Sequence, residues 1–207
     1  MRSWPHWTRC EVTDRTGRVS RKTTETQVEV ELGLDGGAVE VATGIPFFDH
    51  MLDQVGRHGH LGLRVDARGD LDIDAHHTVE DVGIALGEAL ARAVGDKRGI
   101  RRYGDALTPM EEALAQVALD LSGRPLLVYD AAIAAEAIGA YETGLTEEFL
   151  LAFCRTGGIT MHVRLVAGRN AHHCTEAIFK ALARALGEAV DLDPRAGDAV
   201  PSTKGIL

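Results

Sequence analysis

Polar and apolar residues alternate along several stretches of the first half of the chain, as they do in strands that bury one face. Between positions 24 and 32, for example, every second residue is a threonine, valine or leucine. An Asp-Gly-Gly turn at 35–37 then leads into the next alternating stretch. The pattern predicts strands over 24–32, 38–43 and 61–67, a helix over about 47–57, and a hairpin return strand at Leu71 and Ile73 after an Arg68-Gly69 turn.

The second half of the chain shows the same order of patterns. Alternation and a Ser-Gly-Arg-Pro turn at 122–125 predict strands over 113–121, 126–130 and 159–166, and a helix over 146–155. Each half ends in a longer segment with apolar residues at three- and four-residue spacing. This spacing predicts amphipathic helices over roughly 77–94 and 173–190.

A repeated motif indicates that the two halves are copies of one unit. His76-His77-Thr78-Val79-Glu80 recurs 96 positions later as His172-His173-Cys174-Thr175-Glu176, and the apolar stripe that follows is repeated in phase. We therefore expect an α+β fold, an internally duplicated two-layer sandwich in which each half is a small mixed sheet packed on helices. The expected divisions of this one compact domain are an N-terminal tail at 1–17, repeat halves at 18–95 and 96–200, and a C-terminal phosphate-contacting tail at 201–207.

Composition narrows the class of function. The formal net charge of −9 makes a nucleic-acid partner unexpected. The sequence has neither an apolar run of the roughly 20 residues that span a bilayer nor a secretion signal, so we expect a cytoplasmic protein with no membrane partner. Cys10, Cys154 and Cys174 lack C-x-x-C spacing, which favours reduced thiols over disulfides or a zinc knuckle.

The doubled His-His-x-x-Glu motif has the geometry of a metal chelate. The first histidine and the glutamate of each copy stand four residues apart at a predicted helix start, so their side chains share one face. Adjacent side chains diverge by about 100° around a helix, so the second histidine points elsewhere. Two copies therefore suggest two metal ions, each held by ligands from both halves of the repeat or from two subunits.

Further candidate ligands lie upstream of the histidine pairs. His50 stands at the start of the first short helix and Glu148 at the matching place in the second half. Mixed imidazole and carboxylate ligands suit manganese, iron or zinc. Helix capping would explain one histidine pair as well as metal binding does, but it does not require the pair twice. His58, one helix length from His50, is a candidate for the same pocket, whereas His60 and His162 are expected to be surface or hydrogen-bonded histidines.

Basic residues offer a place for an anion. They cluster at 97–102, and Arg124 and the Pro-Ser-Thr-Lys-Gly segment at 201–205 add a guanidinium, hydroxyls and an ammonium. This segment is not a P-loop, because no glycine-rich loop precedes the lysine and no helix follows it. From the residues alone, a phosphate pocket and a solvated linker with a frayed tail are both open readings.

Several long segments resemble the signature segments of the imidazoleglycerol-phosphate dehydratases of histidine biosynthesis. They occur in the family's order and spacing from about Arg18 to the C-terminus, which makes the resemblance specific. The segments are Gly44-Ile45-Pro46-Phe47-Phe48-Asp49-His50-Met51-Leu52-Asp53-Gln54, His76-His77-Thr78-Val79-Glu80-Asp81-Val82-Gly83, Leu119-Asp120-Leu121-Ser122-Gly123-Arg124-Pro125, the second histidine pair, and Pro201-Ser202-Thr203-Lys204-Gly205.

The resemblance implies a hydro-lyase that converts D-erythro-imidazole-glycerol phosphate to imidazole-acetol phosphate, with two manganese ions in each active site. It also implies a cage-like homo-oligomer of about 24 subunits with sites built at subunit contacts. The implied metal ligands are His50, His76, His77, Glu80, His172, His173 and Glu176, with Glu148 standing where many members have a ligating histidine.

The resemblance also suggests which residues meet the substrate. Glu25 matches a substrate-contacting acidic residue, and Glu25 and Glu80 are our candidates for proton transfer. The implied phosphate contacts are Arg102, Arg124, Ser202 and Lys204, and we add His50 and His58 as substrate-binding candidates.

Two other classes of protein would use the same residues. A dimetal hydrolase would activate water between similar ligands, and a metal-storage or structural assembly protein would bind metal without turnover. Release of inorganic phosphate separates a hydrolase from the lyase, because dehydration releases none.

Overall fold

A computed structural model describes residues 15–204 of the chain. Its elements, in chain order, are β1 (Thr16–Lys22), β2 (Gln27–Gly33), β3 (Val39–Ala42), α1 (Pro46–Gly59), β4 (Gly62–Arg68), α2 (His76–Val94), β5 (Tyr103–Met110), β6 (Ala113–Asp120), β7 (Leu126–Asp130), β8 (Ala137–Ile138), β9 (Tyr141–Glu142), α3 (Leu145–Gly157), β10 (Thr160–Ala167) and α4 (Ala171–Val190).

Each half forms a four-stranded sheet, and the two sheets have the same topology. The strand orders are β1-β2-β4-β3 in the first half and β5-β6-β10-β7 in the second. In each order the first three strands are antiparallel neighbours and the last two are parallel. The parallel pairs arise because a helix, α1 or α3, connects their two strands. The prediction of a duplicated α+β fold is confirmed.

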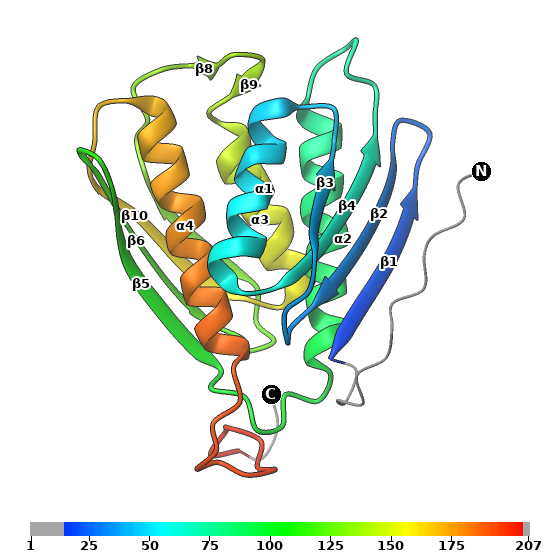
Figure 1. Cartoon of the computed structure of the whole chain (residues 1–207), viewed down its shortest axis with the longest axis vertical. Coiled ribbons are helices and arrows are strands. Elements are labelled where there is room, and N and C mark those ends of the chain that lie inside the picture. The colour runs from blue at the N-terminus through cyan, green and yellow to red at the C-terminus, as the bar shows by residue number, and fades with distance from the viewer. Residues whose placement is uncertain (1–14, 205–207) are drawn as a thin grey trace.

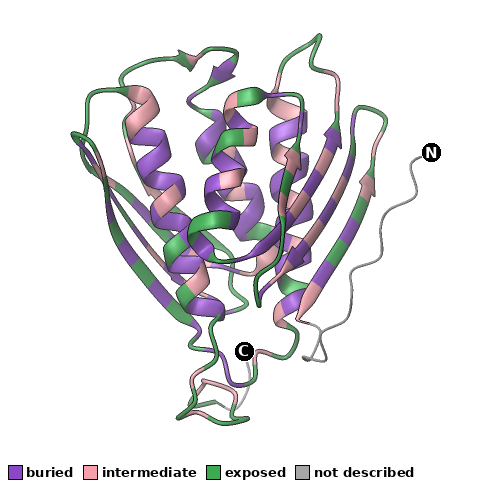
Figure 2. Cartoon of the chain, in the orientation of Figure 1, coloured by how far each residue is buried: buried purple, intermediate pink, exposed green. Residues whose placement is uncertain are grey.

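The two halves meet through their helices, so the sheets lie on the outside of the molecule (Figure 1). α2 packs on β1 and β2, and α4 packs on β5 and β6, while α2 also contacts α3 and α1 contacts α4. The buried faces of these elements form one continuous apolar core (Figure 2). Phe149 lies within it and makes ring contacts with Phe48, Phe153 and Phe179.

The structure corrects the predicted strands in two ways. The edge strands β1 and β5 were not predicted, because their inward positions include glycines, Gly17 and Gly104, and therefore show no apolar alternation. The hairpin return strand predicted at Leu71 and Ile73 is wrong: residues 69–75 are not a strand, and Ile73 is 74% exposed. The short β8–β9 hairpin was not predicted either.

Parts of the predicted tails fall outside the structure. Residues 1–14 of the predicted tail at 1–17 lie outside the described residues, and Thr16 and Gly17 open β1. Residues 205–207 of the C-terminal tail also lie outside them. Cys154 and Cys174 are free and buried, whereas Cys10 is not among the described residues. No helix in residues 15–204 is long and apolar enough to cross a bilayer.

Two glycines allow a helix to lie directly against an edge strand. A Cβ atom at Gly17 would stand 1.8 Å from the carbonyl oxygen of Ala89 in α2, and one at Gly104 would stand 1.9 Å from that of Ala185 in α4. Ala89 and Ala185 are 96 positions apart, as the histidine pairs are. The same close contact therefore holds both long helices at the same height on their sheets.

A Gly104→Ala substitution is expected to destabilise the fold by about 3 kcal/mol, because the added methyl group meets the backbone of α4. Urea unfolding followed by circular dichroism measures the change. Gly144→Ala is the matched control, since no atom lies within 4 Å of a Cβ at Gly144. Equal stability of the two variants would contradict the predicted contact.

Candidate metal centre

The helices of the described chain all begin at the same end of the molecule, the upper end in Figure 1. In α2 and α4, the two helices that carry the histidine pairs, equivalent side chains accept hydrogen bonds from backbone N–H groups of the first turn. Asn170 Oδ1 accepts hydrogen bonds from the backbone N–H groups of His172 at 2.9 Å and His173 at 3.3 Å. Asp74, 96 positions earlier, accepts one from the N–H of His76 at 2.8 Å. Both pairs are thus fixed in the first turn, where N–H groups lack helical partners.

One cluster of donor atoms joins the two halves. His50 from α1 and His172 and Glu176 from α4 place donor atoms within 4.8 Å of one another. Glu176 Oε2 lies 3.1 Å from His172 Nε2 and 3.5 Å from His50 Nε2. Ligand bonds of about 2.1 Å place two ligands of one ion up to roughly 4 Å apart. The chemistry and spacing of these donors therefore fit a divalent cation.

Glu176 is kept as a carboxylate by its neighbours, although it is only 5% exposed. Burial raises its pKa, but Lys180, whose Nζ lies 2.6 Å from Oε1, and then His172 and His50 outweigh burial. The pKa consequently lies below its usual value. A buried anion that already attracts three cationic or potentially cationic groups is a strong acceptor for a metal ion.

The second histidine of each pair faces other carboxylates. His77 Nδ1 lies 3.0 Å from Asp70 Oδ2 and 3.7 Å from Glu25 Oε2. His173 Nδ1 lies 2.7 Å from Glu112 Oε2. The two rings of each pair stand nearly perpendicular, at 85° in the first pair and 84° in the second. The structure thus shows adjacent histidines diverging in the same way in both copies.

The carboxylates and these rings shift one another's pKa values. The hydrogen bond with Asp70 raises the pKa of His77. The hydrogen bond with His173, followed by that from the backbone N–H of Asn170, lowers the pKa of Glu112 to about 2. Neither Asp70 nor Glu112 belongs to a histidine motif, and sequence reasoning missed both.

The equivalent residues with the two repeat halves exchanged do not form a matching cluster. His76 and Glu80 of α2 correspond to His172 and Glu176, and Glu148 in the first turn of α3 takes the place of His50. Among residues 15–204, no group of three donors within 4.8 Å includes His76, Glu80 or Glu148. The single chain therefore assembles one of its two cross-half clusters.

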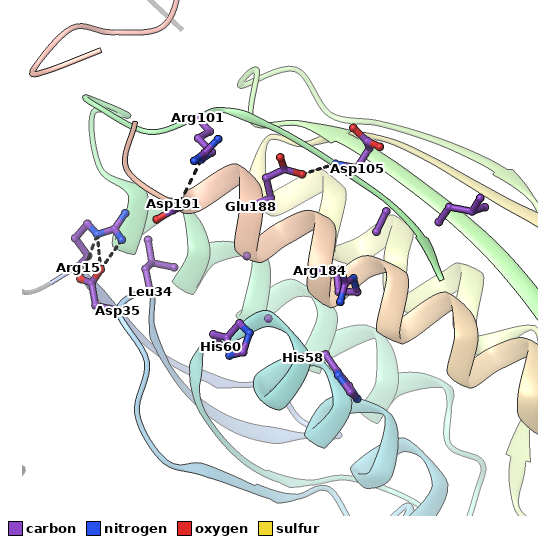
Figure 3. A pocket seen from close by; sticks show the side chains of 14 residues that line it. Arg15, Leu34, Asp35, His58, His60, Arg101, Asp105, Arg184, Glu188 and Asp191 are labelled. Carbon is purple, nitrogen blue, oxygen red and sulfur yellow. Dashed lines mark hydrogen bonds and ion pairs between the residues drawn. The ribbon is translucent and has the colours of Figure 1, made fainter. Parts of the chain in front are cut away.

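His58 lies beside a different pocket. Gln54 Nε2 is 3.4 Å from His50 Nδ1 and Gln54 Oε1 is 3.0 Å from His58 Nε2, so the three residues form a row along α1. Burial, followed by Lys180 and Arg184, lowers the pKa of His58. The structure places His58 about 12 Å along the helix from His50. There it lines a charged pocket between the end of α1 and the C-terminal half of α4 (Figure 3), with lining residues that include His60, Arg184, Glu188 and Asp191.

The four predicted phosphate contacts lie together. Arg102, Arg124, Ser202 and Lys204 line one pocket with Tyr103, Pro201 and Thr203. Arg102 pairs with both oxygens of Asp120, at 2.6 and 3.0 Å, and donates to the carbonyl of Pro201 at 2.7 Å. Lys97, a basic neighbour, has its pKa lowered by burial and then, against the charge of Asp120, by Arg102 and Arg124. These contacts hold the 201–204 segment beside a surplus of positive charge.

The donor cluster and the basic pocket lie near opposite ends of α4 in the folded subunit. His172 stands in the first turn of α4, whereas the backbone N–H of Arg102 bonds to Ala189, near the end of the same helix. α4 has 20 residues and is therefore about 30 Å long. A small ligand held by the donor cluster of one chain cannot reach the basic pocket of that chain.

Comparison with known families decides the class of protein. The model of the imidazoleglycerol-phosphate dehydratase family matches residues 43–186, a span that holds both histidine motifs and most of both repeat halves. The chain belongs to the imidazoleglycerol-phosphate dehydratase family. It is an enzyme of the hydro-lyase class, and the resemblance noted in the sequence is confirmed.

The sequences of individual relatives align with this chain over almost their full length. An imidazoleglycerol-phosphate dehydratase of Jannaschia sp. is 56% identical over 194 residues, which cover 93% of this chain and 100% of the relative. That of Symbiobacterium thermophilum is 57% identical over 195 residues, 94% of this chain and 93% of the relative.

Solved structures of the family have the same fold. The Staphylococcus aureus dehydratase matches with a TM-score of 0.79 and 38% identity, covering 86% of this chain and 99% of that one. The Pyrococcus furiosus enzyme, solved in complex with (S)-C348, matches with a TM-score of 0.80 and 36% identity, covering 91% of this chain and 100% of that one.

Glu176→Gln is expected to weaken Mn²⁺ binding by more than about tenfold, because it removes the anionic member of the cross-half cluster. Titration with Mn²⁺, followed by the electron paramagnetic resonance signal of the free ion, measures the affinity. Glu188→Gln, on the same helix but beside the pocket of Figure 3, is the control. Indistinguishable Mn²⁺ affinities in the two variants would remove Glu176 from the metal centre.

Proposed function

We propose that this dehydratase converts D-erythro-imidazole-glycerol phosphate to imidazole-acetol phosphate, a step of histidine biosynthesis, at a site with two manganese ions. The observation that carries the proposal is the pair of His-His-x-x-Glu motifs at equivalent helix starts, one of them joined by His50 across the two halves. The family match supports the proposal, as do relatives whose alignments with this chain cover more than nine-tenths of its length. A cytoplasmic location stays a prediction made from the sequence.

The proposed ligands are the residues of both motifs and their partners from the short helices. Imidazole nitrogens and carboxylate oxygens together suit manganese, and the two cysteines in the described part of the chain, Cys154 and Cys174, are buried away from this role. Because adjacent histidines diverge, one chain contributes to more than one ion. The proposed set is His50, His76, His77, Glu80, Glu148, His172, His173 and Glu176.

The reaction removes one water molecule. The hydroxyl leaves from the carbon attached to the imidazole ring, the proton leaves from the next carbon, and the resulting enol tautomerises to the ketone. No carbonyl group of the substrate can stabilise the charge that develops, so the ring must serve as the electron sink. Bound manganese would supply a Lewis acid that favours the imidazolate form of the ring.

Two carboxylates of the chain are the candidates for moving protons. The Glu25 side chain is 53% exposed and lies 3.7 Å from His77 Nδ1, so it is open to a ligand beside that ring. Glu80 lies four residues after His76, on the same face of α2. One carboxylate can accept the carbon proton while the other protonates the departing hydroxyl.

The basic pocket is the proposed site for the substrate phosphate. Arg102 and Arg124 provide guanidinium groups, and Ser202 and Lys204 add a hydroxyl and an ammonium. Since about 20 to 25 Å of α4 separates the donor cluster from this pocket in one chain, the phosphate would be held by a different subunit from the one that presents Glu176.

Shared sites require an oligomer, and we propose the family's assembly of about 24 subunits. The outer face of the second sheet supports extensive self-association. The exposed positions of its strands include five large apolar residues, whereas the exposed positions of β1 and β2 are mostly polar or charged. Leu126 and Val128 lie on one face of the edge strand β7, and an exposed apolar edge strand is typical of a protein contact. The five residues are Tyr103, Leu107, Leu126, Val128 and Val166.

Two alternatives predict different products. A dimetal hydrolase with the same ligands would release inorganic phosphate from imidazole-glycerol phosphate, and a storage protein would bind Mn²⁺ without turnover. Incubation of the manganese-loaded protein with this substrate should yield the ketone and no phosphate. Phosphate release, or no product at all, would overturn the proposed function.

Glu25→Gln should lower turnover by about 100-fold or more, since the amide cannot exchange the proton that the carboxylate carries. Mn²⁺ affinity should stay at the wild-type value, because Glu25 is not a proposed ligand. Steady-state assays at saturating Mn²⁺ measure the effect. Full turnover in this variant would exclude Glu25 from proton transfer.

Two defective variants should restore part of the activity when they assemble together. His172→Ala damages the donor cluster, and a variant with Arg124→Ala and Lys204→Ala damages the basic pocket. If each site takes the two parts from different subunits, random co-assembly leaves up to about a quarter of the sites intact. Co-expression with two affinity tags isolates the mixed oligomer. Mixed oligomers no more active than either parent would show that both parts come from one chain.

A further inference from the structure

The second histidine of each pair has a carboxylate at Nδ1, but the two carboxylates come from different places in the repeat. Glu112, just before β6, lies 2.7 Å from His173 Nδ1. Asp70, shortly after β4, lies 3.0 Å from His77 Nδ1. The hydrogen bond is the same in both halves, although the residues that accept it are not counterparts.

The counterpart of Glu112 is Glu25. Gly17 and Gly104 make the same close contact with α2 and α4 and stand 87 positions apart. The paired strands β1–β2 and β5–β6 keep this spacing, so Glu25 and Glu112 occupy the same place in the two hairpins. Glu25 Oε2 is nevertheless 3.7 Å from His77 Nδ1, which is too far for a hydrogen bond.

The segments that precede the histidine pairs explain this difference. Glu112 Oε1 accepts hydrogen bonds from the N–H groups of Arg169 at 3.2 Å and Asn170 at 2.8 Å. The short segment between β10 and α4 therefore holds Glu112 against its histidine. In the first half the segment between β4 and α2, residues 69–75, is longer and supplies its own carboxylate, Asp70. Glu25 is left with its side chain about half exposed.

We propose that Asp70 and Glu112 are positioning residues that orient His77 and His173 for metal binding, and that Asp70 thereby frees Glu25 to meet the substrate. The inference rests on the proposed function. A carboxylate that accepts the Nδ1 proton fixes the tautomer whose Nε2 carries the lone pair, and it makes that nitrogen a better ligand. Two equivalent imidazoles are thus oriented by non-equivalent residues, and Glu25 is left without the histidine hydrogen bond that its counterpart Glu112 makes.

A direct ligand role for Asp70 would give a different result. Asp70, Glu25 and His77 offer donor atoms within 4.8 Å of one another, and Asp70 Oδ1 is buried without a hydrogen-bond partner among the described residues. If Asp70 were itself a metal ligand, its substitution would remove a metal site and lower the number of ions bound. Removing a positioning residue lowers the affinity and keeps the number.

The test is a Mn²⁺ titration of the assembled, substrate-free protein, with free Mn²⁺ followed by electron paramagnetic resonance. Asp70→Ala and Glu112→Ala should each bind Mn²⁺ about 10- to 100-fold more weakly with the wild-type number of ions. The Mn²⁺ concentration for half-maximal activity should rise in parallel. Asp72→Ala, in the same segment as Asp70, and Glu111→Ala, beside Glu112, are the controls and should bind as the wild type does.

Asp70→Asn and Glu112→Gln guard against misfolding, because an amide oxygen still accepts the Nδ1 proton. They should recover most of the affinity that the alanine variants lose. Glu25→Gln should show wild-type affinity together with lost turnover. Loss of bound ions at saturation in Asp70→Ala, wild-type affinity in both alanine variants, or equal weakening by Glu25→Gln would overturn the inference. Failure of the proposed function would show separately, as wild-type protein that binds Mn²⁺ but forms no ketone.

Discussion

Adjacent side chains at the start of a helix point in directions about 100° apart, and the whole site depends on this divergence. His172 turns toward Glu176 and His50, whereas His173 turns toward Glu112. One pair cannot close around a single ion, so every ion needs donors from several helices. The helices must then be held in a fixed relation, which the core between the two sheets and the contacts at Gly17 and Gly104 provide.

Much of the fold could be predicted because the two-residue alternation of the strands and the three- and four-residue spacing of the helices are both strong. The four helices of residues 15–204 lie within about three residues of their predicted bounds, as do most of the inner strands. β1 and β5 escaped prediction because an edge strand that contacts a helix through glycine shows no apolar row. The segment at 69–75 was misread as a strand because two apolar residues happen to alternate there, although it carries Asp70 to His77.

Some residues of the candidate site could likewise be predicted from the sequence, and others could not. The histidines and glutamates of the motifs were visible because they repeat at one offset, and Arg102 and Lys204 were found through family resemblance. Asp70 and Glu112 could not be found from the motif, because Glu112 lies 61 residues from His173, Asp70 lies in a segment misread as a strand, and the two positions do not repeat. Duplication preserved the helix starts and the imidazole orientation, while the surrounding loops diverged. That divergence leaves Glu25 of the first half without the histidine hydrogen bond that its counterpart Glu112 makes.

Anomalous diffraction at the manganese edge, from crystals grown with Mn²⁺ and imidazole-glycerol phosphate, tests the account most directly. Two manganese peaks are expected in each site, with Nε2 of His77 and His173 as ligands and with the substrate phosphate bound by Arg102 and Lys204 of a different subunit. A single peak enclosed by His50, His172 and Glu176, with the phosphate held by the same chain, would contradict it.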